Sequence, residues 1–245
     1  MKNPSEALPQ HIAIIMDGNN RWSKLQSDSA ISGHRAGATA ARDITYLCAD
    51  KNIDVLTLFV FSSENWLRPK KEVNGLMALF LRVLKKKEVS KLHEKNIRLK
   101  FIGDRSRFSE KLQSLMHEAE LMTESNLGLT VVIAANYGGQ WDITNAVKSI
   151  ASKIESGEVN AAQVDQALVE KHISTGDLPM PDLCIRTGGD QRISNFLLWQ
   201  FAYTELYFSD ALWPDFNAVE LDKALQSYAS RQRRYGMASE QVGGS

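Results

Sequence analysis

The stretch His11-Ile12-Ala13-Ile14-Ile15-Met16-Asp17-Gly18 indicates which class of fold to expect. An almost continuous run of apolar side chains leads directly into an aspartate and a glycine. A strand with one face in water would alternate apolar and polar residues, so an unbroken apolar run is typical of a strand covered on both faces. Such strands belong to the parallel sheets of α/β proteins.

The rest of the chain alternates between similar short runs and longer helical patterns. The six expected strands are His11–Asp17, Val55–Ser62, Ile97–Asp104, Leu129–Asn136, Leu183–Thr187 and Glu205–Ser209. The helical patterns lie at Ala36–Asp50, Val73–Leu84, Leu112–Met122, Ile143–Ile154 and Val219–Tyr228. This alternation predicts a single α/β domain with a mainly parallel six-stranded sheet and helices on both faces. We expect the domain to cover residues 11–236, between flexible tails at 1–10 and 237–245.

The composition of the 245 residues is that of an ordinary soluble domain. Lys plus Arg number 29, as do Asp plus Glu, which excludes a nucleic-acid binder held by bulk positive charge. No apolar run approaches the roughly 20 residues of a membrane-spanning helix, and no signal-peptide pattern is visible, so we expect a cytoplasmic protein. Cys48 and Cys184 are too few for a zinc site or a disulfide framework and are expected to be buried thiols.

Polar residues collect after the expected strands. Asp17 to Trp22 follow the first strand, Ser62 to Arg68 follow the second, and Arg186 to Asn195 follow the fifth. Ligands of open α/β sheets bind outside the carboxyl ends of the strands, so these segments are expected to meet at one edge. Each segment alone says little, because loops are polar in any case.

Arg21, Arg68, Arg186 and Arg192 lie in these segments and suit phosphate oxygens. Asp17 is the carboxylate among them, and magnesium is commonly held by one or two carboxylates together with substrate phosphates. The pattern suggests a site for two polyphosphate groups and one Mg²⁺ ion. The competing interpretation is structural: Asp17 caps a helix, and Arg21 or Arg68 is solvated or pairs with a nearby acid.

Glycines and a helix start would add to this anion site. Gly18, Gly188 and Gly189 would let backbone amides approach an anion. A helix starting after Ser194 would favour negative charge at its amino end.

Other residues leave alternatives open. Trp22 and Trp66 are more typical of packing than of ligand contact, and His34 suits either a structural hydrogen bond or a phosphate. The lysines at 85–87 are expected to form a solvated helix end. The chain lacks the dinucleotide-binding glycine fingerprint, the P-loop, the nucleophile elbow and the His-Glu-x-x-His motif, which excludes those enzyme classes.

Taken in order, several segments resemble the cis-prenyltransferase family over about residues 11–236. The segments that carry the resemblance are His11-Ile12-Ala13-Ile14-Ile15-Met16-Asp17-Gly18-Asn19, Gly33-His34-x-x-Gly37, Phe61-Ser62-Ser63-Glu64-Asn65-Trp66-x-Arg68-Pro69, Ala134-Ala135-Asn136-Tyr137-Gly138-Gly139, Asp182-Leu183-x-Ile185-Arg186-Thr187-Gly188-Gly189, Arg192-Ile193-Ser194-Asn195-Phe196-Leu197-Leu198-Trp199-Gln200 and Glu205-Leu206. Long motifs in this order are highly specific. The unrelated trans-prenyl synthases use aspartate-rich pairs, whereas this chain contains no Asp-Asp.

The resemblance implies a Mg²⁺-dependent enzyme that condenses farnesyl diphosphate with successive isopentenyl diphosphates, each new double bond being cis. In bacterial members the product is typically undecaprenyl diphosphate, a lipid-carrier precursor for cell-wall polysaccharide. The resemblance also implies an apolar tunnel for the growing chain, no nucleic-acid partner, and a homodimer to which Arg234-Tyr235-Gly236 contributes. Peripheral contact with the inner face of the membrane stays open. The Val73–Leu84 stripe is then either core or tunnel wall.

The resemblance further assigns roles to individual residues. Asp17 would organise Mg²⁺, Glu205 would add a second metal contact, and Asn65 occupies the position of the proton acceptor, although a carboxamide is a very weak base. The residues implied to bind the allylic diphosphate are Gly18, Asn19, Arg21 and His34, with Asn20 and Trp22 beside them. Those implied for the reacting centre are Ser62, Ser63, Glu64, Trp66 and Arg68, and those for isopentenyl diphosphate are Arg186, Arg192, Ile193 and Ser194.

Three positions depart from the family pattern. Asn20 stands in place of a second glycine, Ala30 in place of an arginine on the allylic diphosphate, and Gln191 in place of a histidine. Loss of the arginine is expected to weaken the allylic site, unless Arg35 or Lys24 substitutes for it.

Two other functions stay in view. One is a non-catalytic subunit of a heteromeric cis-prenyltransferase, and the other is a generic phosphate-binding hydrolase. Asp17, Arg186 and Arg192 favour the enzyme, because a non-catalytic subunit has no need of a metal carboxylate with phosphate clamps.

Overall fold

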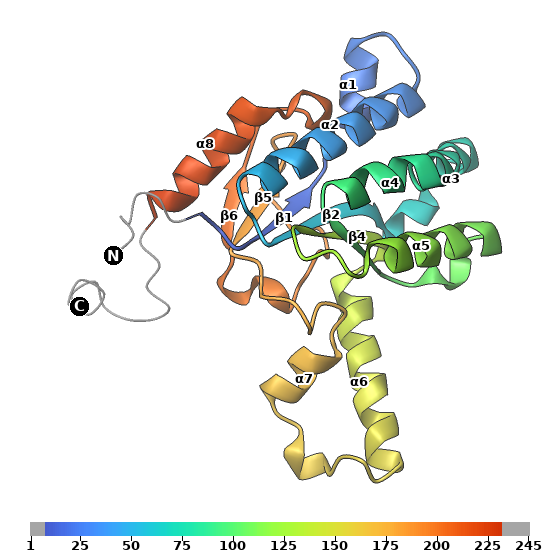
Figure 1. Cartoon of the computed structure of the whole chain (residues 1–245), viewed down its shortest axis with the longest axis vertical. Helices are drawn as coiled ribbons and strands as arrows, with labels where there is room; N and C mark the ends of the chain where they lie inside the picture. Colours follow the sequence, from blue (N-terminus) through green and yellow to red (C-terminus); the bar gives the residue numbers. More distant parts are fainter. Residues whose placement is uncertain (1–7, 232–245) are drawn as a thin grey trace.

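The computed structural model describes residues 8–231, which form a six-stranded sheet in the order β3-β4-β2-β1-β5-β6 (Figure 1). The strands are β1 (His11–Ile15), β2 (Val55–Ser62), β3 (Arg98–Ile102), β4 (Thr130–Tyr137), β5 (Leu183–Arg186) and β6 (Glu205–Phe208). All six predicted strands are confirmed, and every neighbouring pair is parallel. The predicted tail at 237–245, most of the tail at 1–10 and the Arg234-Tyr235-Gly236 motif lie outside the described residues.

Eight α-helices flank the strands within residues 8–231. They are α1 (Asn19–Leu25), α2 (Ala30–Asp50), α3 (Lys70–Val83), α4 (Lys86–Glu94), α5 (Glu110–Thr123), α6 (Gly139–Glu155), α7 (Gln166–His172) and α8 (Ala218–Ala229). The five predicted helical patterns are confirmed, whereas α1 and α7 are too short to show a helical period. The lysines at 85–87 are exposed at the end of a helix, as expected, but Lys85 is the N-cap of α4, so they begin that helix and do not close α3.

Alternate residues of β1 enter two cores on opposite faces of the sheet. Ile12 and Ile14 join the core beneath α2, α3, α4, α5 and α8. Ala13 and Ile15 join a second core, which is closed by the start of α6 and the segment 193–201. Both faces of the strand are therefore buried, which explains its unbroken apolar sequence. The rest of α6 and α7 projects away from the sheet (Figure 1).

A cavity of about 400 Å³ opens between α4 and α5, where Leu84, Val89, Leu115 and Met122 contribute to its lining. The Val73–Leu84 stripe places side chains in the first core, which confirms the core interpretation of that stripe. The apolar tunnel stays a prediction. No helix between residues 8 and 231 combines the length and the apolar character that a bilayer crossing requires.

His11 is fully buried at the start of β1. Its ring contacts the carbonyl oxygen of Pro179 through Nδ1 at 2.7 Å and the hydroxyl of Thr57 through Nε2 at 2.8 Å. Burial lowers the pKa of His11 from 6.5 to about 4, although the Pro179 carbonyl and the charge of Asp182 oppose the change. The ring is therefore neutral in the folded protein at neutral pH.

We expect folding stability to fall as the pH drops from 6.5 to about 4, because unfolded His11 then binds a proton that folded His11 does not. The full loss is about 3 kcal/mol, at about 1.4 kcal/mol per pKa unit. Urea unfolding of the wild type and of His11→Gln at neutral and acid pH measures it. The variant should be less stable at neutral pH but lose less stability on acidification; equal losses in both proteins would contradict the assignment.

Candidate active site at the carboxyl edge of the sheet

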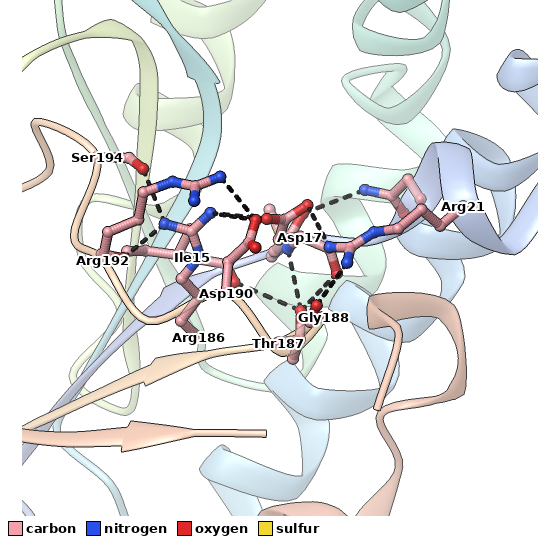
Figure 2. A network of polar contacts seen from close by, with 11 residues as sticks. Ile15, Asp17, Arg21, Arg186, Thr187, Gly188, Asp190, Arg192 and Ser194 are labelled. Carbon is pink, nitrogen blue, oxygen red and sulfur yellow. Dashed lines mark hydrogen bonds and ion pairs between the residues drawn. The ribbon is translucent and has the colours of Figure 1, made fainter. Parts of the chain in front are cut away.

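Asp17 and Arg186 meet where β1 and β5 end. Asp17 follows β1 two residues after Ile15, whose partner on β5 is Arg186. Nη2 of Arg186 donates to Asp17 Oδ2 at 2.7 Å, and Arg21 Nη2 lies 3.2 Å from Asp17 Oδ1 (Figure 2). The N-cap of α1 is Gly18, so Asp17 is not a helix cap. Two of the predicted arginines therefore bracket this carboxylate.

The backbone of Asp17 is fixed by Thr187, which the sequence did not single out. The Thr187 hydroxyl donates to the carbonyl oxygen of Asp17 at 2.7 Å and accepts from its N–H at 3.0 Å. Gly188 follows with φ +84°, and its carbonyl oxygen accepts from Arg21 Nη1 at 2.6 Å. A Cβ at position 188 would lie 2.4 Å from Arg21 Nη2, so a side chain there would displace the arginine.

Asp190 links the pair to a third arginine. Its Oδ2 accepts from Arg192 Nη2 at 2.7 Å and from Arg186 Nη2 at 3.3 Å (Figure 2). Nη1 of Arg186 donates to Ser194 Oγ at 2.8 Å and to the carbonyl oxygen of Arg192. The result is a row of alternating charges that begins at Arg21 and ends at Arg192. The sequence did not single out Asp190, because the order of residues does not show that its carboxylate contacts both Arg186 and Arg192.

Burial differs along this row. Arg186 is 4% exposed, whereas the side chains of Asp17 and Arg192 are 30% and 64% exposed. Burial alone would raise the pKa of Asp17, but the hydrogen bond and charge of Arg186 and the charge of Arg21 hold that pKa below its usual range. Asp17 is therefore ionised at neutral pH and supplies the buried guanidinium with a fixed counterion.

A magnesium ion fits this arrangement only together with anionic ligand oxygens. Among residues 8–231, no group of three or more His, Cys, Asp or Glu side chains is arranged to hold a metal. Asp17 offers a partly exposed carboxylate with lone pairs beyond those taken by the guanidinium groups. A cation beside Arg21 and Arg186 would be repelled unless an anion entered with it. One carboxylate plus substrate phosphates is a common way to bind Mg²⁺.

Glu205 does not lie beside Asp17 within the chain. It begins β6, where its partner on β5 is Leu183, at the opposite end of that strand from Arg186. Three residues along a strand span about 10 Å. The Glu205 carboxylate instead accepts from Arg231 Nη1 at 2.7 Å. Strand register therefore separates the two predicted metal ligands of one chain.

His34 and Arg68 meet at Glu72, a second acid that the sequence did not single out. Glu72 Oε1 lies 3.0 Å from Arg68 Nη1, 3.4 Å from His34 Nε2 and 3.1 Å from Asn20 Nδ2. Burial and then the charge of Arg68 lower the pKa of His34, against the opposing influence of Glu72. The ring is therefore neutral at neutral pH. Arg68 thus pairs with a nearby acid, as the competing structural interpretation allows, and its part in binding substrate stays a prediction.

The segment after β2 forms the 3-10 helix η2 (Ser63–Leu67). Asn65 closes a capping box there, because its Oδ1 accepts from the Ser62 N–H at 3.0 Å. The oxygen that would take a proton is thus already engaged. Trp66 packs edge-on against Phe61 and donates to Asn136 Oδ1 at 2.8 Å, which favours packing over ligand contact.

The first residues of α1 are held by contacts within the chain. Gly18 has φ +107° and lies against the loop before η6 (Trp213–Asp215). Nδ2 of Asn19 donates to the carbonyl oxygen of Met16 at 3.2 Å, and Trp22 Nε1 donates to Asp215 Oδ1 at 2.8 Å. The ring nitrogen of Trp22 is therefore engaged within the chain.

Two expectations about anion-binding backbone are wrong. In the described chain no α-helix begins at the residues that directly follow Ser194; Ser194, Asn195 and Leu197 have positive φ, which an α-helix excludes. The amides of Gly188 and Gly189 donate to backbone carbonyl oxygens of the segment after β6, at 2.8 and 2.9 Å. They are therefore committed to the fold.

The segments after β2 and β5 touch. Glu64 on η2 accepts a hydrogen bond from Asn195 at 2.9 Å. Ser63 lies beside Glu64 at the start of η2, and Ile193 packs against the second core. The structure thus brings both predicted substrate-binding segments to one edge of the sheet.

The sequence of this chain is similar to those of known proteins along almost its whole length. The family profile described as undecaprenyl diphosphate synthase matches residues 15–236. The ditrans,polycis-undecaprenyl-diphosphate synthase ((2E,6E)-farnesyl-diphosphate specific) of Pseudomonas putida is 53% identical over 96% of this chain and 94% of its own length. The synthase of the same name from Haemophilus influenzae is 52% identical over 94% of this chain and 95% of its own length.

Solved structures agree with these sequence relatives. Lavandulyl diphosphate synthase from Lavandula x intermedia, solved in complex with dimethylallyl diphosphate, superposes with a TM-score of 0.90. It is 37% identical, and the match covers 94% of this chain and 98% of that one. The profile match, the near full-length relatives and the shared fold together place the chain in the undecaprenyl diphosphate synthase family of cis-prenyltransferases.

Proposed function

We propose that this chain synthesises undecaprenyl diphosphate by adding successive isopentenyl diphosphates to farnesyl diphosphate, with cis double bonds. The names of the Pseudomonas putida and Haemophilus influenzae relatives support the product and the allylic substrate. The observation that carries the proposal is the ionised Asp17 bracketed by Arg21 and Arg186 at the carboxyl edge of the sheet. That arrangement suits two diphosphate groups and the cation that they bring.

The allylic substrate reacts by losing its diphosphate, so negative charge builds on the departing oxygens. Arg21 lies at this point with a half-exposed guanidinium, and Arg68 and His34 lie on the neighbouring polar cluster. Fixed hydrogen-bond donors that point at the developing negative charge lower the activation barrier. Each such donor raises the rate by roughly 10²–10³-fold. We assign Arg21 and His34 to the allylic diphosphate and Arg68 to the reacting centre beside it.

Arg186, Arg192 and Ser194 are assigned to isopentenyl diphosphate. The buried Arg186 is held by Asp17, whereas Arg192 is 64% exposed and would exchange its contact with Asp190 for a ligand within the reach of its side chain. The new carbon–carbon bond forms as the allylic C–O bond breaks, and a proton then leaves the isopentenyl carbon. Because Asn65 Oδ1 is engaged by Ser62, we assign Asn65 to orientation and the proton to the released diphosphate.

Asp17 would hold Mg²⁺ together with diphosphate oxygens. When bound, the ion neutralises charge on the departing diphosphate and so stabilises the transition state. Glu205 of the same chain takes no part in this assignment, because the strand register separates it from Asp17.

The function is tested by incubating the pure protein with Mg²⁺, farnesyl diphosphate and labelled isopentenyl diphosphate. Long cis-polyprenyl products are expected. Absence of products would point to a non-catalytic subunit, and release of phosphate alone would point to a hydrolase. The length of the products reports the chain length that the sequence leaves open.

Ala30→Arg is expected to lower the KM for farnesyl diphosphate by about threefold to tenfold, which corresponds to the net contribution of about 1 kcal/mol that one hydrogen bond typically makes. Ala30 begins α2 four residues before His34, so the two positions share a helix face. Steady-state kinetics measure the change, and Ala30→Gln is the uncharged control. An unchanged KM would mean that another cation, such as Arg35 or Lys24, already serves the allylic site.

We also propose a homodimer and a peripheral contact with the inner face of the membrane. The first rests on the family resemblance and the second on the insolubility of a long polyprenyl product in water. Sedimentation of the pure protein tests the dimer, because the measured mass should be twice the monomer mass of 27.4 kDa. Co-sedimentation with lipid vesicles tests the membrane contact.

A further inference from the structure

One side chain ties the two substrate-binding segments together. Nδ2 of Asn195 donates to Glu64 Oε1 on η2 at 2.9 Å, and its Oδ1 accepts from the backbone N–H of Gln140 at 2.9 Å. Its carbonyl oxygen accepts from the N–H of Gly139 at 2.6 Å. A single residue after β5 therefore contacts both η2 and the first turn of α6.

The backbone around Asn195 adopts a conformation that L residues rarely take. Ser194, Asn195 and Leu197 have φ values of +48°, +60° and +42°. Phe196 and Leu197 are fully buried in the second core, which anchors the segment on one side. Such conformations persist only where the surroundings over-determine them, and at this point the surroundings are the core and the polar contacts of Asn195.

Gly138 leaves the space that these contacts need. A Cβ at position 138 would lie 2.7 Å from Asn195 Nδ2 and 2.8 Å from Ser63 Oγ. The backbone of Gly138 is extended, so any residue could adopt it. The requirement for glycine is therefore a requirement for room between η2 and the Asn195 side chain.

The residues just before Asn195 are those assigned to isopentenyl diphosphate. Ser194 Oγ accepts from Arg186 Nη1, and the Arg192 carbonyl oxygen accepts from the same nitrogen. Glu64, on the other side of the contact, lies in the segment assigned to the reacting centre. A shift of this contact would change the distance between the two substrates.

We propose that Asn195 is a positioning residue that fixes the isopentenyl diphosphate clamp relative to the reacting centre. The proposal rests on the proposed function. Reacting carbons must approach to about 3–3.5 Å, and a displacement of about 1 Å can cost roughly 10²-fold in rate. Loss of the contact should therefore reduce kcat/KM for isopentenyl diphosphate by about 10–100-fold, while the KM for farnesyl diphosphate changes by less than about threefold.

An exchange of charge between the partners tests the contact. Asn195→Asp sets a carboxylate against Glu64 and should cause the loss above, although its oxygen can still accept from Gln140. In Asn195→Asp combined with Glu64→Gln, the new glutamine amide can donate to the new aspartate and restore the hydrogen bond. We expect the double variant to recover about tenfold or more of the kcat/KM that Asn195→Asp loses. A smaller recovery, or a normal kcat/KM in Asn195→Asp, overturns the proposal.

Asn160→Asp is the matched control, because Asn160 caps a short 3-10 helix on the connection between α6 and α7 and an aspartate caps equally well. Thermal unfolding of each variant separates loss of the contact from loss of the fold. If the wild type makes no polyprenyl product, the proposed function fails by itself. Calorimetric binding of isopentenyl diphosphate to the same variants then tests the positioning role, with the same pattern of loss and recovery expected in Kd.

Discussion

Asp17→Ala is expected to abolish turnover, with a loss of at least ~10³-fold in kcat. Arg21 and Arg186 would keep their charges but lose the carboxylate between them. Without this carboxylate, the guanidinium groups on both sides would repel a divalent cation. The cation could then no longer bind to the protein and the diphosphates together. Single-turnover assays with labelled isopentenyl diphosphate over a range of Mg²⁺ concentrations measure the loss.

The Asp17→Ala variant is expected to remain folded. Asp190 Oδ2 lies 3.3 Å from Arg186 Nη2, so the buried guanidinium keeps one counterion. Asp43→Ala, which removes an exposed acid paired with Arg42 on α2, is the matched control for loss of a carboxylate. Substantial activity in folded Asp17→Ala would remove this residue from the mechanism.

Arg186→Met is expected to reduce kcat/KM for isopentenyl diphosphate by about 10²–10³-fold. Methionine replaces the buried stem but supplies none of the donors that contact Asp17, Asp190 and Ser194. The two acids left behind are about one-third exposed, so water can solvate them and the fold should survive.

Steady-state kinetics and thermal unfolding measure the two effects of Arg186→Met separately. Arg42→Met, at an exposed arginine of α2, controls for loss of a guanidinium group. A KM for isopentenyl diphosphate equal to that of the wild type would show that Arg186 only supports Asp17 and does not bind this substrate.

Local pattern was enough to predict the architecture. The strand that ends at Ile15 and the strand that ends at Arg186 each carry their own apolar signal, and burial on both faces is typical of strands in a parallel sheet. The meeting of Asp17 with Arg186 then follows from a general rule, since parallel strands present their carboxyl ends at one edge.

Contacts that depend on tertiary structure could not be predicted. Glu72 on α3 contacts Asn20 of α1, His34 of α2 and Arg68 of the turn after η2, and the packing of these segments has no signature in the sequence of any one of them. For Glu205 the motif does predict a site residue, because it matches the family. The strand register nevertheless places Glu205 at the end of β5 that lies away from the site.

The backbone conformation of the segment after β5 could not be predicted from the sequence either. Positive φ values after Ser194 arise because Phe196 and Asn195 are each drawn to a different partner, one apolar and one polar. The composition of this segment is compatible with a helix. Only the three-dimensional partners reveal that the backbone must turn left-handed instead.

The row from Arg21 to Arg192 contains three guanidinium groups and two carboxylates, so positive and negative charges alternate along it. An oxyanion arriving by itself would gain three attractions and suffer two repulsions, which leaves little net binding. A diphosphate escorted by a divalent cation instead offers positive charge to the acids and oxygens to the bases. The site is thus expected to bind sulfate and orthophosphate weakly and to prefer the complex of a diphosphate with a divalent cation.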